Sequence, residues 1–394
     1  MARRAEEAPL RPHGRAVWGM AVASGATVAN LYYNQPLLPD IARTFGVSDH
    51  AVGLIPTLTQ VGYGAGMLLV VPLGDSHERR RLVLILTGAV TAALLVAAAA
   101  PSLPVLALAS AAIGVSTGVP QILVPYAATL AAPEERGRAV GIVTSGLLFG
   151  VLLSRTLSGV VGEALGWRAM YLFAAGLMVM LGIALRLELP VSAPAAPMRY
   201  RTLLRSLREL VREEPELRLH SVLGALTFGA LTAFWATLAL FLRDLPAHYG
   251  PSTAGLYGLV GVAGALAAPL VGRAADARSD RRINSVAIAS MLVAFVELAI
   301  AGGHLLGIAV GVVLLDFGAQ ANHISNQTRI FALREEARSR LNTVYMVAYF
   351  AGGAVGAYSG TLAYAAWGWP GVCGVGVGFC AAGLAVVLRS RVSR

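Results

Sequence analysis

The chain has 394 residues, of which 56% are hydrophobic and 13% are charged, and its mean hydropathy is +0.67. Soluble globular proteins carry about 25% charged residues, so this composition argues against a soluble protein and places most of the chain in a membrane. The two cysteines, Cys373 and Cys380, lie seven residues apart in one apolar run. That spacing along a helix is too wide for a disulfide bond, so they indicate no redox compartment.

Twelve apolar runs follow one another along the chain, each of about the length that spans a bilayer as a helix. They lie near residues 16–38, 51–72, 82–100, 103–128, 139–163, 168–187, 219–242, 252–272, 284–302, 304–328, 341–366 and 368–389. The first run follows a basic segment, but it is too long for a signal peptide and lacks a small-residue cleavage site. We therefore expect it to be retained, and the sequence predicts an all-α polytopic membrane protein with twelve transmembrane helices.

The arginines predict the orientation of these spans. Arg43, Arg168 and Arg243 fall in loops on one side and Arg155 falls within a span, which leaves 27 of the 31 arginines on the side of the N-terminus. Loops rich in arginine face the cytoplasm. We therefore expect a cytoplasmic (inner) membrane protein with both termini in the cytoplasm. The net charge of +10 then belongs at the lipid surface, and no nucleic-acid partner is expected.

The only long polar stretch covers residues 190–218. It begins with several prolines, after which Leu203, Leu207 and Leu210 recur at helical spacing with arginines on the opposite face. This pattern predicts an amphipathic helix on the cytoplasmic membrane surface, or equally a solvated linker helix. The linker divides the chain into two six-helix bundles, residues 1–189 and 219–394.

The two sides of this linker resemble each other. Residues 134–138 (EERGR) recur as residues 335–340 (EEARSR), and Trp167 corresponds to Trp369. Two parallel repeats of six spans predict pseudo-symmetric bundles related by an axis along the membrane normal. In transporters built this way the substrate site lies between the repeats.

The loop after the second span reads Gly74-Asp75-Ser76-His77-Glu78-Arg79-Arg80-Arg81, and it is echoed by Asp276 followed by Arg281 and Arg282. At these residues the chain resembles the major facilitator superfamily over essentially its whole length. In particular it resembles the small-solute and drug efflux branch, often described as arabinose-efflux-permease-like. Ser76 and Glu78 depart from the family loop, and Arg155 stands where exporters of this type carry a proline. The resemblance implies alternating access, with spans one, four, seven and ten lining a central cavity.

The same loop is a candidate conformational latch, formed by Asp75, Arg79, Arg80 and Arg81 with Asp276 as its counterpart in the second bundle. A carboxylate at the cytoplasmic end of a span can pair with an arginine or with a helix N-terminus, and such a pair stabilises one conformation. The alternative is that the arginines serve topology alone, although that does not explain Asp75.

The tenth span carries a polar stripe. Asp316, Gln320, His323 and Gln327 recur at spacings of 4, 3 and 4, which places them on one helical face, and Asn326 flanks them. A polar stripe within a membrane faces a cavity or another helix, not lipid. The functional interpretation is a solute path in which Asp316 binds and releases a proton at mid-depth and His323 relays it. The alternative is a helix–helix hydrogen-bond network.

Further candidates complete a mixed amide and aromatic pocket, suited to an amphipathic solute. They are Asn30, Tyr33 and Asn34 in the first span, Gln121 in the fourth, and Phe234 and Trp235 in the seventh. Tyrosine and tryptophan near span ends can equally form an interfacial belt. Arg155 needs a partner inside the membrane, for which Asp316, Asp40 and an anionic solute are candidates. We expect Glu297, in the ninth span, to pair with a neighbour or to lie at the interface.

These features predict a secondary transporter that moves a small organic solute by alternating access, with proton-coupled efflux as the leading interpretation and uptake as the alternative. A membrane-embedded enzyme or sensor is not favoured, because no metal-binding motif, nucleophile elbow, phosphate-binding loop or signalling domain is found in the sequence. We expect no cofactor and no metal. The expected partners are a small-molecule substrate, protons and membrane lipids, and the chain is expected to act as a monomer.

Overall fold

The computed structural model of the chain describes residues 14–191, 200–274 and 280–390, and all regular elements in these ranges are helices. Nine of the described helices are long and apolar enough to cross a membrane, and two shorter apolar helices cover Ala16–Ala29 and Pro251–Leu266. The chain is therefore an all-helical membrane protein, and the count of twelve spans stays a prediction.

The elements of the first part of the chain are α1 (Gly14–Ala29), η1 (Gln35–Leu37), α2 (Leu38–Phe45), α3 (Asp49–Val52), α4 (Leu54–Leu69), α5 (Leu73–Ser76), α6 (Arg79–Ala98), α7 (Leu103–Ser116), α8 (Val119–Leu130), η2 (Pro133–Glu135), α9 (Arg136–Leu165) and α10 (Trp167–Glu188). Those of the second part are α11 (Tyr200–Glu213), α12 (Pro215–Trp235), α13 (Leu238–Asp244), α14 (Pro251–Ala274), α15 (Asp280–Ala301), α16 (Leu305–Leu333), η3 (Glu335–Ala337) and α17 (Arg338–Arg389).

Several predicted spans are interrupted, and the interruptions have local causes. The first span breaks between α1 and α2 just before Pro36, and the fourth breaks between α7 and α8 just before Pro120, because proline cannot donate the hydrogen bond that continues a helix. The 52 residues of α17 would extend about 78 Å as one straight helix, far more than a bilayer of about 30 Å. The chain turns inside α17 at Gly368, whose φ of 63° is a left-handed conformation that suits glycine.

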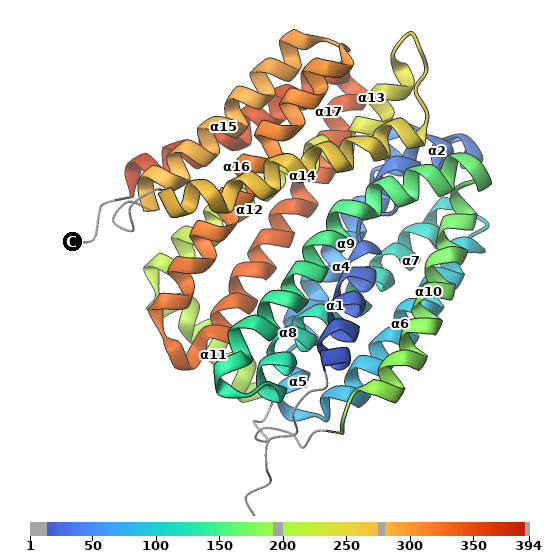
Figure 1. Ribbon diagram of the computed structural model, residues 1–394. Coiled ribbons are helices and arrows are strands. Elements are labelled where there is room, and N and C mark those ends of the chain that lie inside the picture. Colours follow the sequence, from blue (N-terminus) through green and yellow to red (C-terminus); the bar gives the residue numbers. More distant parts are fainter. Residues whose placement is uncertain (1–13, 192–199, 275–279, 391–394) are drawn as a thin grey trace, which may run out of the picture.

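The helices pack as two groups (Figure 1). Helices α1 to α10, drawn blue to green, pack on one another, and α12 to α17, drawn yellow to red, pack on one another. The two helix pairs with the most extensive contact between the groups are α9 with α14 and α4 with α17. We call these groups the first and the second bundle; the boundaries at residues 189 and 219 stay predictions.

Each bundle contains the same close helix crossing. A side chain added at Gly150 of α9 would overlap the backbone of Gly25 in α1, and one added at Gly356 of α17 would overlap the backbone of Gly229 in α12. Small residues spaced four apart let two helix backbones approach this closely inside a membrane. The recurrence of the crossing agrees with two bundles built on one plan.

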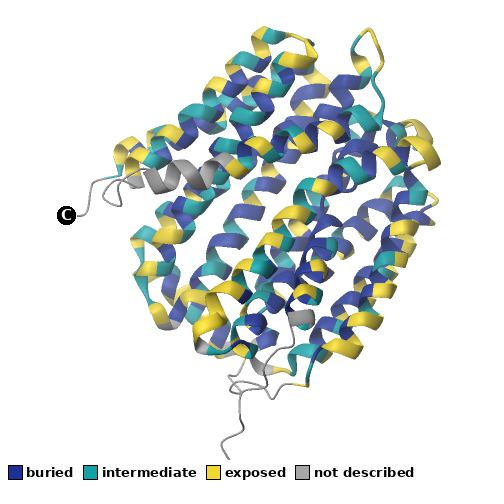
Figure 2. Ribbon diagram, in the orientation of Figure 1, coloured by how far each residue is buried: buried dark blue, intermediate teal, exposed yellow. Residues whose placement is uncertain are grey.

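Burial follows the pattern of a membrane protein (Figure 2). Large apolar side chains are exposed on the outer surfaces of the helices, among them Trp18, Leu108, Met180 and Ile300. Asparagine, threonine and serine side chains are buried inside the bundles. An apolar outside around a partly polar inside suits lipid as the surrounding solvent.

Helix α11 has its apolar face against protein. Leu203, Leu207 and Leu210 are buried, while Arg205 and Arg208 are exposed. The helix packs on α17 and α12. The linker helix expected at the lipid surface or in solvent therefore rests on the second bundle, because its leucine stripe is covered by neighbouring helices.

Candidate functional site

The two ends of the molecule differ in charge, and we name them accordingly. Arg79, Arg136, Arg338 and Arg389 mark helix ends at the arginine-rich end. The arginine-poor end contains the opposite helix ends, including the starts of α3 and α14 and the turn at Gly368. By the positive-inside rule the arginine-rich end is the predicted cytoplasmic end.

Arg155 lies in α9, between the two bundles, and only 5% of it is exposed. Its Nε donates a hydrogen bond of 2.7 Å to Gln35 Oε1, from the break between α1 and α2. Its guanidinium carbon lies 4.0 Å from the ring centre of Trp235 and 4.9 Å from that of Tyr32. Cation–π contacts of this kind stabilise a desolvated arginine. The residue therefore joins groups from both bundles.

Asp316, half-buried in α16 of the second bundle, is the acid that interacts electrostatically with Arg155. The two side chains form no ion pair within 4.0 Å in the part of the chain that the structure describes. Of the other candidate partners on the chain, Asp40 pairs instead with Arg43, at 2.9 Å. Arg155 and Asp316 are thus opposite charges held on facing bundles without direct contact.

Two buried polar atoms next to this pair lack a partner. Asp316 Oδ2 and the indole Nε1 of Trp235 have no partner with full hydrogen-bond geometry among the described residues, although the indole N–H lies close enough to the carboxylate to interact with it. Gly261 of α14 adjoins both side chains: a Cβ built there would lie 2.7 Å from Asp316 Oδ2 and 3.6 Å from the Trp235 ring. An acceptor and a donor without partners thus lie close to each other, beside a residue that has no side chain.

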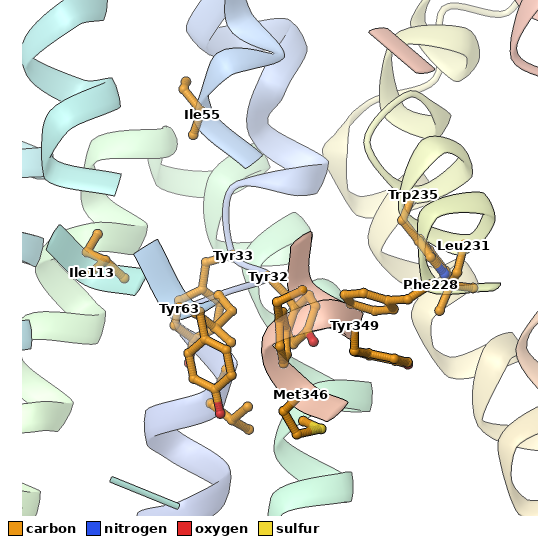
Figure 3. Close-up of a cluster of buried hydrophobic side chains, with 14 of the residues drawn as sticks. Tyr32, Tyr33, Ile55, Tyr63, Ile113, Phe228, Leu231, Trp235, Met346 and Tyr349 are labelled. Carbon is orange, nitrogen blue, oxygen red and sulfur yellow. The ribbon is translucent and has the colours of Figure 1, made fainter. Parts of the chain in front are cut away.

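Aromatic side chains from both bundles form one buried cluster that includes Trp235 (Figure 3). Tyr32, Tyr33 and Tyr63 come from the first bundle, and Phe228, Trp235 and Tyr349 come from the second. Phe228 and Tyr349 stack with ring centres 4.0 Å apart, and Tyr63 meets Phe350 edge-on across the bundles at 4.4 Å. The amide of Gln121 donates to the Tyr63 hydroxyl at 3.3 Å. Tyr33, Gln121 and Trp235 therefore belong to one region between the bundles.

The remaining stripe residues of α16 are half-buried on the same helical face as Asp316. His323 Nδ1 lies 3.0 Å from the Tyr345 hydroxyl, and its ring contacts Tyr349. Gln327 donates to Asn342 Oδ1 at 3.3 Å, and Gln320 lies between Asp316 and His323. The stripe thus continues from the Arg155 position toward the arginine-rich end.

Asn326 lies outside this stripe. Its carboxamide oxygen interacts with His220 Nδ1 at 2.8 Å and accepts from Asn284 at 3.2 Å, and its nitrogen donates to Asn322 at 2.8 Å. Thr227 donates to Asn322 at 2.9 Å. This buried network joins α12, α15 and α16 inside the second bundle. For Asn326 the geometry is that of the helix–helix network, not of the expected pocket.

Three other pocket candidates point into their own bundle. Asn30 donates to the Thr27 carbonyl and contacts Met178 Sδ of α10, and Asn34 donates to Thr59 Oγ1. Phe234 packs edge-on against Trp369, with ring centres 5.9 Å apart. The structure thus places the three inside the helix packing of their own bundle, although Phe234 also meets the ring of Trp235 edge-on at 5.3 Å.

Glu297 is half-buried in α15 beside Gly311 of α16. Its Oε2 has no hydrogen-bond partner among the residues that the structure describes, so it shows none of the neighbour pairing considered above.

The latch candidates are described only in part. Asp276 lies outside the described residues, and for Asp75 the structure describes the backbone within α5 but not the side chain. Arg79 donates to the Gly74 carbonyl and to Thr129, and Arg80 donates to the Arg186 carbonyl at 2.5 Å. The backbone N–H groups of Arg80 and Arg81 bind the Glu78 carboxylate, which caps α6. These contacts fasten the loop within the first bundle, and the latch stays a prediction.

The sequence analysis missed a cross-bundle ion pair at the arginine-poor end. Arg243 binds Asp49 through two hydrogen bonds, of 2.9 and 2.8 Å, and its Nε binds Asp244 at 2.7 Å. The Tyr364 hydroxyl donates to Asp244 at 2.7 Å. We call these four residues the clasp. An arginine at the end where the positive-inside rule predicts few is a sequence signal that could have pointed to it.

Other cross-bundle contacts lie at the same end. Thr156 Oγ1 donates to the Gly255 carbonyl at 2.8 Å, and the Ser252 N–H donates to Glu163 at 2.9 Å. Together with the clasp, these hydrogen bonds join the two bundles. The bundles are thus fastened together at the arginine-poor end.

Comparisons with known proteins agree with this architecture. The sequence model of the Major Facilitator Superfamily matches residues 20–333. The uncharacterized transporter YgaY of Escherichia coli O157:H7 is 40% identical over 356 residues, which cover 90% of each chain. The chloramphenicol efflux pump Rv0191 of Mycobacterium tuberculosis is 28% identical over 86% of this chain and 84% of its own. A crystal structure of the peptide transporter POT superposes with a TM-score of 0.78 at 13% identity, over 97% and 96% of the two chains, and so shares the fold.

Proposed function

We propose, since the chain belongs to the Major Facilitator Superfamily, that this transporter exports a small organic solute across the cytoplasmic membrane in exchange for protons. The observation that carries the proposal is the charge pair between the bundles: Arg155 on the first faces Asp316 on the second, and Asp316 keeps a buried oxygen without a hydrogen-bond partner. One relative named as an efflux pump supports the export direction.

The chemistry of a carboxyl group links the proton to the solute. An ionised Asp316 accepts hydrogen bonds through Oδ2 and attracts Arg155. A protonated Asp316 loses its charge and its attraction for Arg155, and the proton occupies an oxygen that a solute would otherwise use. Proton and solute then compete for one side chain, which is the requirement for exchange of one against the other.

The same event biases the conformation. Arg155 and Asp316 belong to bundles that are fastened together at the arginine-poor end, so a change in their attraction changes the balance between states open to either side. The half-buried stripe of Gln320, His323 and Gln327 would connect Asp316 with the cytoplasmic end, and His323 would relay protons along it.

Purified protein in liposomes that enclose a pH-sensitive dye tests this proposal. A panel of small organic compounds is added one at a time under an imposed proton gradient. We expect at least one compound to elicit proton movement opposite in direction to its own, with no such response in Asp316→Asn. Proton movement in the same direction as the solute would instead establish the uptake alternative, and solute flux without proton movement would contradict the coupling.

A further inference from the structure

We propose that the central site binds uncharged aromatic solutes that carry a hydroxyl or amide group, and that Arg155 is not a receptor for anions. This inference rests on the proposed function and specifies the class of solute. It follows from what already occupies Arg155, from the two unpartnered polar atoms beside it, and from the rings around them.

Arg155 is already engaged on the protein side. Arginine receptors for carboxylates commonly use two parallel N–H groups as a fork. In this chain the Nε edge of the fork is bound to Gln35, and the guanidinium lies against the rings of Trp235 and Tyr32. Asp316 also compensates the charge. The position as a whole therefore presents no net positive charge to a solute.

The indole N–H of Trp235 and the carboxylate oxygen of Asp316 together favour a neutral group on the solute. Trp235, of which 3% is exposed, offers an N–H donor, and Asp316 Oδ2 beside it offers an acceptor. A hydroxyl or an amide can accept from the indole and donate to the carboxylate at the same time. An ammonium group has no acceptor for the indole, and a carboxylate has no donor for Asp316, so either charged group leaves one of the two atoms without a partner.

The aromatic residues near these atoms favour an aromatic ring in the solute. Tyr32, Phe228, Trp235 and Tyr349 belong to one buried aromatic cluster (Figure 3), in which the rings of Trp235 and Tyr32 lie 4.0 and 4.9 Å from the Arg155 guanidinium carbon. Rings of this kind favour a flat ring in a stacked or edge-on arrangement. Gly261 packs closely against both groups: a Cβ there would lie 2.7 Å from Asp316 Oδ2 and 3.6 Å from the Trp235 ring, so a larger residue at this position would displace the acceptor.

Three probes that share one ring test the charge preference. Chloramphenicol, for which a relative is named, is uncharged and carries hydroxyl and amide groups. Its hemisuccinate ester adds a carboxylate, and the amine left by removal of its dichloroacetyl group is a cation near pH 7. Equilibrium binding to the purified full-length protein is measured for each. We expect chloramphenicol to bind, and both charged probes to bind at least about tenfold more weakly.

Two variants test whether chloramphenicol binds at this site. Trp235→Phe removes the indole N–H and keeps an aromatic ring, so chloramphenicol should bind roughly fivefold more weakly with little change in melting temperature. Trp369→Phe is the matched control: this tryptophan donates to the Leu298 carbonyl inside the second bundle, and its loss should leave binding unchanged. Equal or tighter binding of either charged probe would overturn the inference. So would absence of chloramphenicol binding, or full binding in Trp235→Phe.

The binding and flux experiments can contradict the two proposals independently of each other. Selective binding of the uncharged probe without proton movement in liposomes would count against the proposed function alone. Proton-coupled flux of an anionic compound would leave the proposed function intact and remove the inference about solute charge.

Discussion

Arg155 is a permanent charge inside a membrane span, and its surroundings show how the fold accommodates it. An arginine in a bilayer needs partners, since placing its charge at the centre of the membrane costs about 3 kcal/mol or more. Here the partners are one charge-assisted hydrogen bond, two aromatic rings and an opposing carboxylate. These groups come from α1–α2, α12 and α16, so a single side chain couples the packing of both bundles.

The first prediction concerns this coupling. Arg155→Ala should abolish proton-driven transport and lower the free energy of unfolding by about 1–3 kcal/mol, because Asp316 keeps a partly buried charge without its cation. Arg155→Lys should retain part of the activity, since it keeps the charge but loses the planar group. Adding Asp316→Asn to Arg155→Ala should restore the melting temperature but not transport.

The control for this series is Arg138→Ala, an exposed arginine of the same helix, which should match the wild type in both readouts. Normal transport by Arg155→Ala would contradict the coupling role and leave Arg155 as a packing residue.

At the residue scale, the sequence predicted which side chains are exceptional but not which neighbours they meet. Arg155 and Asp316 stand out because each is a lone charge within an apolar run. Gln35 and Tyr32 could not be assigned to Arg155, since their positions depend on how the chain turns between α1 and α2. Phe234 and Trp235 are adjacent, yet one faces Trp369 and the other faces Arg155.

At the element scale, α16 shows two polar faces with different uses. Helical spacing groups Asp316, Gln320, His323 and Gln327, but a polar sector this broad also takes in Asn326, one position from Gln327. The geometry separates the adjacent pair: Gln327 is half-buried and contacts α17, whereas Asn326 is enclosed between α12 and α15. The orientation of a polar residue at the edge of the stripe depends on the neighbouring helices, which sequence spacing does not specify.

The second prediction follows from this division. Asn326→Ala should lower the free energy of unfolding by about 1–2 kcal/mol, because it leaves His220 and Asn284 without a buried partner, while transport per folded molecule stays near normal. Gln320→Ala, on the other face of the same helix, should leave the melting temperature unchanged and weaken solute binding. Melting curves and solute binding are measured on both variants. Weakened binding with an unchanged melting temperature in Asn326→Ala would place Asn326 in the solute path.

At the scale of the whole molecule, hydropathy and helical spacing predicted the helical class, and most predicted spans agree with the helices within a few residues. The turn between the last two predicted spans falls at Gly368, next to the expected boundary. The clasp was not predicted, because Asp49 and Arg243 are 194 positions apart and belong to different bundles.

The third prediction concerns the clasp. Asp49→Asn removes a half-buried ion pair worth about 1 kcal/mol, which corresponds to a roughly fivefold shift toward states open at the arginine-poor end. Thr361→Cys reports the opening, because Thr361 is buried against Gly53 across the bundles. In a background without the two native cysteines, labelling of this position should become about fivefold faster.

The matched control is Asp40→Asn, which breaks an ion pair at the same end but within the first bundle, and it should leave the labelling rate unchanged. Equal labelling in Asp49→Asn and wild type would show that the clasp does not hold the bundles closed.

The fourth prediction concerns orientation. Single cysteines at Ala2, Ser206 and Ser393 should resist impermeant thiol reagents in intact cells, because the arginine-rich end is the predicted cytoplasmic end. A cysteine at Ala247, an exposed position at the arginine-poor end, should react. Labelling of Ser206→Cys from outside would invert the orientation and with it the proposed export direction.

The central claim, that Asp316 exchanges a proton for the solute, is tested most directly by flux in proteoliposomes. Wild-type protein and Asp316→Asn are compared in two modes: transport driven by a proton gradient, and exchange of labelled for unlabelled solute at equal pH. We predict that Asp316→Asn loses gradient-driven transport while exchange continues, because the amide cannot bind and release the proton. Gradient-driven transport at the wild-type rate in Asp316→Asn would contradict the claim.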